Sequence, residues 1–498
     1  MNLEKDLKKL FHFDTFRPGQ KEVISSILDR NHTLAMLPTG TGKSLCYQFP
    51  ALQMDGIIII ISPLLSLMQD QVEQMKMNGE KRVVALNSFL SRTEKNYVLE
   101  NIRNYKFLFI SPEMIRNTQV LELLKKMTIG LFVIDEAHCI SQWGYDFRPE
   151  YQKLGEVRKT LGSPVTLALT ATATEEIRKD IKKTLFLEDV VEVIYSVDRP
   201  NIALCVEKIP TSKKKMSRLF QLVENLQGPG IIYFSSKKMA EQTAAFLREK
   251  VKKNCTSYHG GMSQEDRILI QQQFLNGQLD VICATSAFGM GINKENIRFV
   301  IHFHMPSQFE SYLQEIGRAG RDQQPSVAIL LYVQGDEFLA HQLAEMELPT
   351  ELQIKQLELS LAAYNRYEEW EIVEKNWLES HFSETQWRVL QAYIFSERKD
   401  RQLLIKKLHS FNHHRRIRLE KKNQKIADFL HWIHGETCRR RKITDYFAEK
   451  NNPIALQRCC DRCGLELSDY FGKRSMPSEP EGNVNWKELL GQILLKSE

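Results

Sequence analysis

Along the first 170 residues, short apolar runs alternate with longer stretches of helical pattern. The apolar runs occupy 32–37, 57–61, 83–86, 107–110, 131–134 and 165–169. Each run is rich in branched side chains, which is typical of strands that are buried on both faces of a parallel sheet. We therefore expect an α/β domain over about 1–200, with its functional groups at the carboxyl ends of the strands.

The same alternation restarts further along, with apolar runs at 231–234, 256–259, 281–284, 299–302 and 327–331. It predicts a second sheet domain over 201–340. Beyond that the pattern becomes helical, and Pro349 marks a boundary. We expect a helical insert over 341–415, a helical cysteine-bearing region over 416–470 and a flexible tail over 471–498. The predicted fold class is α/β, with two tandem doubly wound parallel-sheet domains and a mainly helical C-terminal region.

Composition narrows the class of protein only slightly. The 498 residues are 42% hydrophobic, enough for several cores, and their formal net charge is +6. This mild positive charge permits a nucleic-acid partner without establishing one. No run of eighteen apolar residues occurs, so we expect no membrane span, and the charged N-terminal residues do not form a secretory signal. Five dispersed cysteines are typical of buried thiols in a reducing cytoplasm, and they are Cys46, Cys139, Cys205, Cys255 and Cys283.

A glycine-rich loop follows the first apolar run and precedes a helical pattern. It consists of Thr39, Gly40, Thr41, Gly42, Lys43 and Ser44. The backbone N–H groups of such a loop, together with the positive end of the next helix, cradle phosphate. Lys43 can then reach the β- and γ-phosphates, and the Ser44 hydroxyl can bind Mg²⁺. The full pattern has glycine at position 37, where this chain has Leu37. Taken alone, the loop can also be an ordinary strand-to-helix turn.

Two adjacent acids, Asp135 and Glu136, follow the apolar run at 131–134. In proteins with a phosphate-binding loop, an acid at a neighbouring strand end holds Mg²⁺, and a second acid can orient the attacking water. Two acids at a strand end can also be merely solvated. Their combination with the glycine-rich loop favours a site for ATP and Mg²⁺.

Two further features of the first domain have competing interpretations. Gln20 can bond an adenine edge and Phe13 can stack on its ring. Residue types alone favour a helix cap and a core phenylalanine instead. Between 139 and 151, aromatic residues crowd an irregular stretch that also contains Arg148. Such a loop suits base stacking and backbone contact with a nucleic acid, and a buried aromatic cluster is the alternative.

The second domain has no glycine-lysine-serine loop, so we expect it to complete the site of the first. Arg318 and Arg321 lie three residues apart and would share one face of a helix. An arginine that enters from across a cleft stabilises charge on a transferring phosphoryl group. A surface helix with ion pairs is the alternative.

Nine motifs resemble, in order, those of the RecQ family of superfamily 2 DNA helicases. They lie at 16–20, 39–44, 135–138, 141–144, 147–151, 169–173, 258–261, 284–292 and 314–322. The resemblance implies two RecA-like domains and an ATP-dependent helicase. It also implies 3′→5′ travel on single-stranded DNA and unwinding of branched duplex DNA in recombination and repair. Three positions depart from the usual residues of the family: His304 replaces aspartate, Ile316 threonine and Gln323 glycine.

The resemblance also implies roles for residues at the nucleotide. Phe13 stacks on adenine, and Arg17 and Gln20 read its edge. Asp135 holds the metal, and Glu136 orients water.

Further roles follow for the arginines and the aromatic loop. Arg321 is implied to be the arginine finger, with Arg318 beside it. Trp143, Phe147 and Arg148 are implied to bind a nucleic-acid strand and to couple that binding to hydrolysis.

Relative to the family, roughly seventy extra residues precede the cysteine cluster. We interpret them as a small helical insert, with one helix after Ser383 and a second over 400–408. A DNA-binding helix pair is one interpretation, and core packing is favoured. Residues 401–442 contain thirteen Lys or Arg against three acids, which either bind phosphates or form a solvated helix face.

A second group of cysteines lies near the C-terminus and comprises Cys438, Cys459, Cys460 and Cys463. In a reducing compartment, four thiols with a C-x₂-C element predict a structural Zn²⁺ site. Cys459 is the least regular ligand because it adjoins Cys460, and His431 or His434 are weaker substitutes. A redox dithiol is the non-metal alternative. The residues after Cys463 are too few for the last two domains of the family. The chain therefore resembles the short RecS-type form of the family.

Three functions are compatible with these residues. The preferred one is an ATP-hydrolysing DNA helicase. An RNA-stimulated ATPase would use the same phosphate contacts, which do not read the sugar. A nucleotide-dependent clamp on nucleic acid would bind ATP without unwinding. We expect no membrane partner in any of the three cases.

Overall fold

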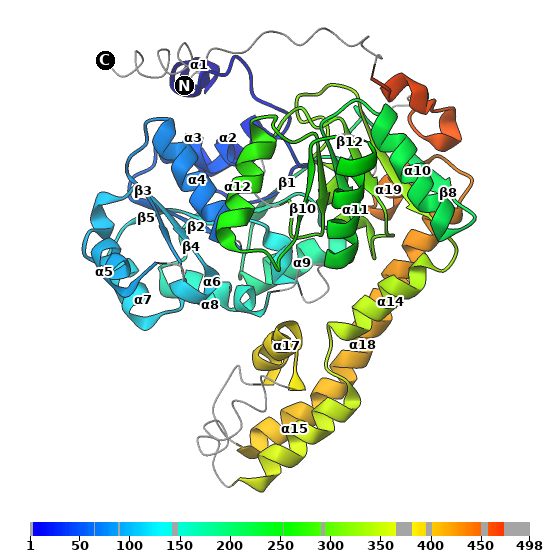
Figure 1. Cartoon of the computed structure of the whole chain (residues 1–498). Coiled ribbons are helices and arrows are strands. Elements are labelled where there is room, and N and C mark those ends of the chain that lie inside the picture. The colour runs from blue at the N-terminus through cyan, green and yellow to red at the C-terminus, as the bar shows by residue number, and fades with distance from the viewer. Residues whose placement is uncertain are drawn as a thin grey trace.

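The computed structural model describes residues 3–63, 65–87, 90–141, 148–251, 253–289, 294–364, 381–394, 401–449 and 457–472. Two sheet domains lie side by side, and a long helical arm extends away from them (Figure 1). Both predicted parallel sheets are present, so the expected α/β fold class with a helical C-terminal region is confirmed.

The first sheet has seven parallel strands in the order β3-β4-β2-β5-β6-β1-β7. The strands are β1 His32–Met36, β2 Ile57–Ile61, β3 Val83–Leu86, β4 Phe107–Ile110, β5 Ile129–Ile134, β6 Thr166–Thr170 and β7 Val190–Ile194. The five isoleucines of β2 show why this sheet is buried. Ile59 and Ile61 face one hydrophobic core, and Ile58 and Ile60 face another on the opposite side.

Helices cover both faces of this sheet (Figure 1). They are α2 Gln20–Leu28, α3 Leu45–Ala51, α4 Leu65–Met77, α5 Arg92–Glu100, α6 Pro112–Ile115, α7 Thr118–Leu124, α8 Leu154–Thr160 and α9 Glu175–Thr184. Helix α1 Leu3–Phe11 packs on α2 and α3 rather than on the sheet. Three short 3₁₀ helices complete the domain: η1 Ile102–Asn104, η2 Ala137–Ile140 and η3 Pro149–Lys153.

The second sheet has six parallel strands in the order β10-β11-β9-β12-β13-β8. They are β8 Ile202–Lys208, β9 Gly230–Tyr233, β10 Cys255–Tyr258, β11 Val281–Ala284, β12 Phe299–His302 and β13 Ser326–Tyr332. The helices of this domain are α10 Ser212–Asn225, α11 Lys237–Lys250, α12 Gln264–Leu275 and α13 Phe309–Ile316. Neighbouring Ile231 and Ile232 again face different cores, so this sheet is also covered on both sides.

The hydrophobic pattern predicts eleven of the thirteen strands and misses β7 and β8, one in each sheet. Each is the last strand at one edge of its sheet. In β7 only Val193 is fully buried, so its pattern does not stand out from a loop. β8 differs from β7, because its first five residues are apolar and buried, so its pattern was itself sufficient to predict a strand.

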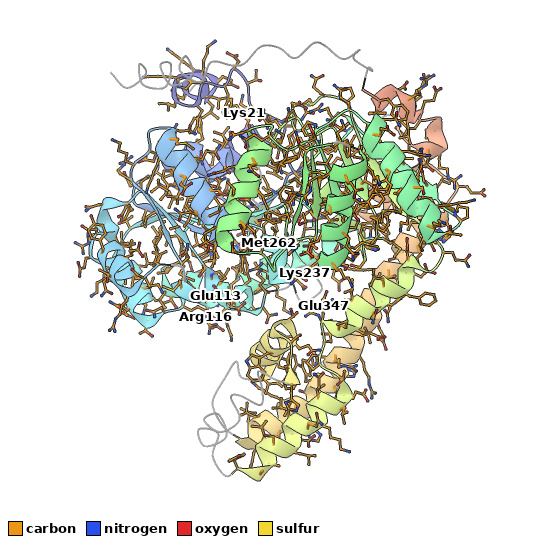
Figure 2. The ribbon with its side chains drawn as sticks, in the orientation of Figure 1. Lys21, Glu113, Arg116, Lys237, Met262 and Glu347 are labelled. Atoms are coloured by element: carbon orange, nitrogen blue, oxygen red, sulfur yellow. The ribbon has the colours of Figure 1, made fainter. Side chains whose placement is uncertain are left out.

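The arm contains α14 Asp336–Met346, α15 Glu351–Ala363, α17 Glu384–Ile394 and α18 Arg401–His434. α18 returns alongside α14 and α15, and buried leucines at 357, 390 and 404 give the arm a core of its own. Glu347, at the end of α14, marks the place where the arm meets the two sheet domains (Figure 2). The arm is therefore a packed unit with its own core.

The two helices predicted in this region are present, but the second is much longer than expected. It begins near residue 400 as predicted and continues past 408 to His434. No glycine or proline between 401 and 434 stops it. α18 thus passes through residue 415, where the sequence predicts the insert to end. Among the described residues, no helix combines the length and the apolar character that crossing a membrane requires.

The last described segment returns to the second sheet. It contains α19 Arg439–Tyr446, η4 Asp461–Cys463 and η5 Leu467–Tyr470. The Leu204 N–H donates to the Cys459 carbonyl at 3.1 Å, and the Val206 N–H donates to the Asp461 carboxylate at 3.3 Å. Because β8 is an edge strand, these bonds satisfy backbone groups that would otherwise be open. From residue 473 on, the predicted tail lies outside the described residues.

Candidate active site

The glycine-rich loop joins β1 to α3 at the carboxyl end of the first sheet. Gly40 and Gly42 have φ angles of 85° and 74°, in the left-handed region that residues with side chains avoid. Leu37, which replaces a glycine of the usual pattern, is fully buried, and its Cδ2 lies 2.4 Å from where a Cβ on Gly19 would be. The absence of a side chain at Gly19 therefore makes room for Leu37, and the turn itself keeps its glycines.

Two side chains from the preceding segment hold this loop. Arg17 Nη1 donates to the Gly40 carbonyl at 2.6 Å, and Gln20 Nε2 donates to the next two carbonyls at 2.7 and 3.0 Å. Gln20 Oε1 accepts from the Arg17 N–H at 2.8 Å, so both ends of the amide are engaged within the protein. Gln20 thus supports the loop, a role the sequence did not suggest. The Phe13 ring is 52% exposed, as a surface for stacking requires.

The two acids end β5, and their surroundings disfavour a second negative charge. Burial first, and then the charge of Glu136, raises the pKa of Asp135, while Lys43 acts in the opposite direction. Glu136 has a φ angle of 48°, and its carboxylate lies 3.4 Å from His138 Nδ1. The same His138 nitrogen lies 3.0 Å from Thr170 Oγ1, which connects the acids to the end of β6.

The polar groups near Asp135 fit a magnesium ion. Ser44 and Asp135 offer the hydroxyl and carboxylate oxygens that Mg²⁺ prefers. Ser44 Oγ donates to Gln71 Oε1 at 3.0 Å, so its oxygen is held at the foot of the loop. A nearby cation would stabilise the charged form of Asp135, whose pKa burial raises.

An arginine from the second domain covers the glycine-rich loop. A Cβ on Gly40 would lie 3.1 Å from Arg321 Cγ. Burial, followed by the positive charges of Arg318 and Arg199, lowers the pKa of Arg321. A phosphate in the cleft would offset this concentration of positive charge. The geometry therefore brings Arg321 and the phosphate loop together.

The second predicted arginine points elsewhere. Arg318 donates through Nη1 to the Gly289 carbonyl, and a Cβ on Gly289 would lie 2.2 Å from Arg318 Nη2. The residue before Gly289 is also held, because the Tyr233 hydroxyl donates to the Phe288 carbonyl at 2.9 Å. Arg318 thus ties the arginine motif to the segment after β11, and of these two arginines it is Arg321 whose Cγ lies against the glycine-rich loop.

The two domains touch where the arginine motif meets the glycine-rich loop. A Cβ on Gly317 would lie only 1.8 Å from Thr39 Oγ1, so a side chain there would force the loops apart. Arg199 bridges the same contact. Its Nη1 donates to the Thr39 carbonyl at 2.7 Å, and its Nη2 donates to the Gly320 carbonyl at 2.6 Å.

Sequence reasoning missed Arg199, because the residues at 198–201 looked like a domain boundary and nothing more. Helix α19, which follows Cys438, reaches the same junction. Arg440 donates to the Arg199 carbonyl at 3.0 Å and to the Ile202 carbonyl at 2.6 Å. Asn201 Nδ2 adds a bond of 2.8 Å to the Gly320 carbonyl. An arginine directly before a proline between two sheet domains was the only available signal.

The three departures from the family pattern have local explanations. Gln323 has a φ angle of 64°, a conformation in which glycine is favoured. Ile316 is buried in the core beneath the arginine motif. His304 Nδ1 accepts from the Ser235 N–H at 3.0 Å, and burial first, then the charge of Lys215, lowers the pKa of His304 to about 4. The imidazole is therefore neutral and can accept this bond at neutral pH.

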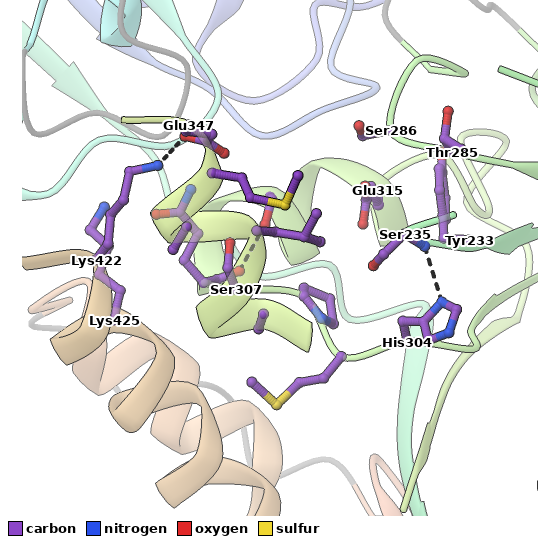
Figure 3. A pocket seen from close by; sticks show the side chains of 18 of the residues that line it. Tyr233, Ser235, Thr285, Ser286, His304, Ser307, Glu315, Glu347, Lys422 and Lys425 are labelled. Carbon is purple, nitrogen blue, oxygen red and sulfur yellow. Dashed lines mark hydrogen bonds and ion pairs between the residues drawn. The ribbon is translucent and has the colours of Figure 1, made fainter. Parts of the chain in front are cut away.

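A cavity of about 640 Å³ lies at the carboxyl ends of the second sheet's strands. Ser235, Thr285 and Ser286 follow β9 and β11 and line it (Figure 3). Arg148 lines it from the first domain, and its Nη1 donates to the Pro63 carbonyl at 2.5 Å. Of the predicted nucleic-acid residues only Arg148 can be placed, since Trp143 and Phe147 lie outside the described residues.

The four C-terminal cysteines come together as predicted. All four sulfur atoms lie within 4.8 Å of one another, with Cys438 Sγ 3.6 Å from Cys459 Sγ and 4.0 Å from Cys460 Sγ. Zinc–sulfur bonds of 2.3 Å in a tetrahedron place sulfurs roughly 3.8 Å apart, so the cluster fits Zn²⁺. Cys459 belongs to the cluster, whereas the proposed substitute His434 packs against Tyr332.

Each of the two sheet domains matches a known protein family. Residues 17–180 match the DEAD/DEAH box helicase family, and residues 214–323 match the helicase conserved C-terminal domain. The first match contains the glycine-rich loop and the two acids, and the second contains both arginines.

Two relatives illustrate the similarity in sequence. The probable ATP-dependent DNA helicase RecS of Bacillus subtilis is 48% identical over 472 residues, which cover 95% of this chain and 94% of RecS. The ATP-dependent DNA helicase RecQ of Pasteurella multocida is 41% identical over 389 residues, which cover 77% of this chain and 60% of RecQ.

Solved structures share the fold at lower identity. Helicase Lhr of Mycobacterium smegmatis, bound to ssDNA and AMP-PNP, has a TM-score of 0.56 at 20% identity, over 68% of this chain and 49% of Lhr. The DEAD-box helicase Mss116, bound to ssRNA, has a TM-score of 0.57 at 16% identity, over 82% of this chain and 90% of Mss116. At these identities the likeness concerns the fold alone.

The resemblance seen in the motifs therefore extends far beyond them. Nearly half of the residues are identical to RecS across almost the whole of both proteins. The chain belongs to the RecQ/RecS family of ATP-dependent DNA helicases.

Proposed function

We propose that this protein hydrolyses ATP with Mg²⁺ between its two sheets and uses the cycle to move along single-stranded DNA and unwind duplex DNA. One observation supports this proposal above the others. The side chain of Arg321, from the second domain, covers Gly40 of the first domain's phosphate loop. A nucleotide between them would contact both domains at once.

Each side chain at the nucleotide would have a separate role. Lys43 and the glycine-rich loop would hold the phosphates, and Ser44 and Asp135 would hold Mg²⁺. When bound, that ion would neutralise phosphate charge. Glu136, whose carboxylate adjoins His138, would orient the attacking water.

The nucleotide's adenine end and the arginine complete the arrangement. Phe13 would stack on the adenine, next to Arg17 and Gln20. Arg321 would stabilise charge on the γ-phosphate as it transfers, with Arg318 fixing the motif that carries it.

The same electrostatics would open and close the cleft between the two domains. Burial, followed by the positive charges of Arg318 and Arg199, lowers the pKa of Arg321 in the closed cleft. ATP would supply the anion that favours closure, and loss of the γ-phosphate would weaken that attraction and allow the domains to part. A strand that contacts both domains would be moved, and family likeness supports the 3′→5′ direction.

DNA is the substrate that the comparisons favour. Both RecS and RecQ carry the name DNA helicase, whereas the RNA-bound neighbour Mss116 shares only the fold. We propose single-stranded and branched duplex DNA as partners, and recombination or repair as the setting. Arg148 and the hydroxyl residues of the cavity would contact the strand's phosphates. The five dispersed cysteines are buried free thiols, which supports a reducing cytoplasm as the compartment.

We further propose that Cys438, Cys459, Cys460 and Cys463 bind one structural Zn²⁺. The ion would fix the segment that carries Arg439 and Arg440. Arg440 bonds the junction between the sheets, so the metal would stabilise the hinge as well as its own loop.

Removing either side of the nucleotide site should abolish hydrolysis. We expect Lys43→Ala to lower the DNA-stimulated ATPase rate at least about 100-fold and Arg321→Ala about 1,000-fold, because each withdraws charge from the transferring phosphoryl group. The measurement is phosphate release with single-stranded DNA or RNA as the stimulating strand. The exposed Arg248→Ala on α11 is the matched control and should retain full activity.

Two outcomes would contradict the proposal. Hydrolysis by Lys43→Ala at the native rate would exclude a motor of this kind and favour a clamp. An ATPase rate with RNA that equals or exceeds the rate with DNA would show that DNA is not the preferred substrate.

Loss of the Arg199 bridge should slow hydrolysis without weakening ADP binding. Hydrogen bonds to a charged group contribute about 1.5–3 kcal/mol, so we expect Arg199→Ala to lower kcat about tenfold to a hundredfold. ADP affinity, measured with a fluorescent analogue, should stay within about twofold, because Arg17 and Gln20 still hold the loop. Arg199→Lys should recover part of the rate. An unchanged kcat in Arg199→Ala would show that the bridge does not position the site.

The zinc proposal predicts one tightly bound Zn²⁺ per chain. Cys460→Ser should lose the metal and lower the melting temperature, because the β8 edge and the hinge lose their support. Cys255→Ser is the matched control, since the Cys255 thiol donates to the Ala244 carbonyl and a hydroxyl can do the same. A native protein with no zinc and a disulfide among these cysteines would instead establish the redox dithiol.

A further inference from the structure

The helical arm crosses from the second domain to the first. α14 begins just after β13 of the second sheet, and α18 runs back towards the segment that carries the four clustered cysteines (Figure 1). Between them, α17 packs against η3 of the first domain, directly after Arg148. The arm thus starts on one domain and touches the other.

The arm also forms one side of the 640 Å³ cavity. Four basic residues on successive turns of α18 line it: Arg418, Lys421, Lys422 and Lys425. Ser383 and Thr385 at the start of α17 line it as well, opposite the hydroxyl residues of the second sheet. Figure 3 shows Lys422 and Lys425 on α18 at one side of the cavity, with Lys422 paired to Glu347 at the end of α14, and Ser235 and Thr285 at the other side.

The arm is rigid because hydrogen bonds hold its helices to one another. Gln386 Nε2 of α17 donates to the carbonyls of Met346 and Leu348 at 3.1 and 3.2 Å. Gln353 of α15 donates to the His381 carbonyl at 2.5 Å. With its own core, the arm can shift as one body about its root.

Two lysines one turn apart on α18 attach the arm to different domains. Lys425 Nζ lies 3.0 Å from Glu310 Oε1 of α13, in the second domain, and the Glu310 side chain is fully buried. Lys421 Nζ lies 2.5 Å from Glu176 Oε1 of α9, in the first domain, and these two side chains are 39% and 59% exposed. The attachment to the second domain is therefore buried and firm, and the attachment to the first is exposed and weak enough to open.

We infer that the arm is the outer wall of the strand groove and that Lys421–Glu176 is its latch. A nucleic-acid strand in the cavity is bordered by the strand ends of the second sheet, by Arg148 of the first domain and, on the open side, by α17 and α18. Each of the three lysines on this face of α18 is paired with a carboxylate, Lys421 with Glu176, Lys422 with Glu347 and Lys425 with Glu310, so a lysine contacts the phosphodiester backbone only where its pair opens. Closing the latch surrounds the strand and slows its release.

The Lys421–Glu176 latch also depends on the distance between the two sheet domains. Glu176 belongs to the first domain, and the arm is rooted in the second. Parting of the two sheets separates the pair, and closure around ATP brings it together. This inference rests on the proposed function, because it assumes a single-stranded nucleic acid in the cavity.

A charge-swap cycle on the full-length protein separates a latch from a simple phosphate contact. The variants are Lys421→Glu, Glu176→Lys and the double swap. The measurement is the dissociation rate from a circularised, fluorescent oligodeoxythymidine with AMP-PNP present and excess unlabelled strand as competitor. The matched control is the double swap of Glu175 and Lys179, an exposed pair on the same helix α9 with Nζ and Oε1 2.7 Å apart.

We expect each single variant to dissociate about two- to fivefold faster than the native protein, which is the range for one exposed ion pair. The double swap should return to the native rate, and the α9 control should not change it. Faster release by Glu176→Lys is the decisive result, because this change adds positive charge next to the groove.

Slower release by Glu176→Lys, with no recovery in the double swap, would overturn the latch and leave Lys421 as an ordinary phosphate contact. A native protein that hydrolyses ATP with DNA but shows no change in any variant would also overturn the latch while leaving the motor intact. A native protein that neither binds the circle nor hydrolyses ATP would overturn the proposed function itself.

Discussion

The contact between Thr39 and Gly317 is the constraint on which the rest of this structure depends. Two loops from different sheets approach so closely that a Cβ on Gly317 would lie 1.8 Å from the threonine oxygen. Arg199 fastens the contact through carbonyls on both sides, at 2.7 and 2.6 Å. Because this contact is direct, Arg321 is carried onto the phosphate loop. Anything that changes the distance between the loops changes the site.

The closed contact is electrostatically incomplete without a nucleotide. Burial and the neighbouring arginines make it costly to hold the charge of Arg321, and burial with Glu136 makes it costly to ionise Asp135. A phosphate chain with its cation would relieve both costs at once, since it brings negative charge to the arginines and positive charge to the acids. The cleft is thus built for a ligand that carries both signs. The arm and the segment that carries the four clustered cysteines extend this logic, because each is attached to the junction or to both domains by charged side chains.

Much of this architecture could be predicted from the sequence, and particular residues show where prediction stopped. The isoleucines of β2 and the glycines at 40 and 42 carry local signals, so the sheets and the phosphate loop followed from pattern. β7 carries little signal because most of its residues lie at the surface, whereas β8 begins with a buried apolar run at 202–206 that was sufficient to predict a strand. Arg199 carries no motif of its own, and only the folded chain brings it to Thr39 and Gly320. The four sulfurs come together as the cysteine pattern predicts, and Cys459 is among them although it directly adjoins Cys460. The length of α18 agrees with the absence of glycine and proline between 401 and 434.

The central claim is that one nucleotide holds both sheets and that losing its γ-phosphate lets them part. The most direct test is the distance between dyes placed through unnatural amino acids at exposed Glu100 on α5 and Glu249 on α11, with ATP analogue, with ADP and without nucleotide. The account predicts one closed distance with the analogue and a different, broader distribution with ADP, and no closed state in Arg321→Ala. The same distance in all three conditions, in both proteins, would contradict it.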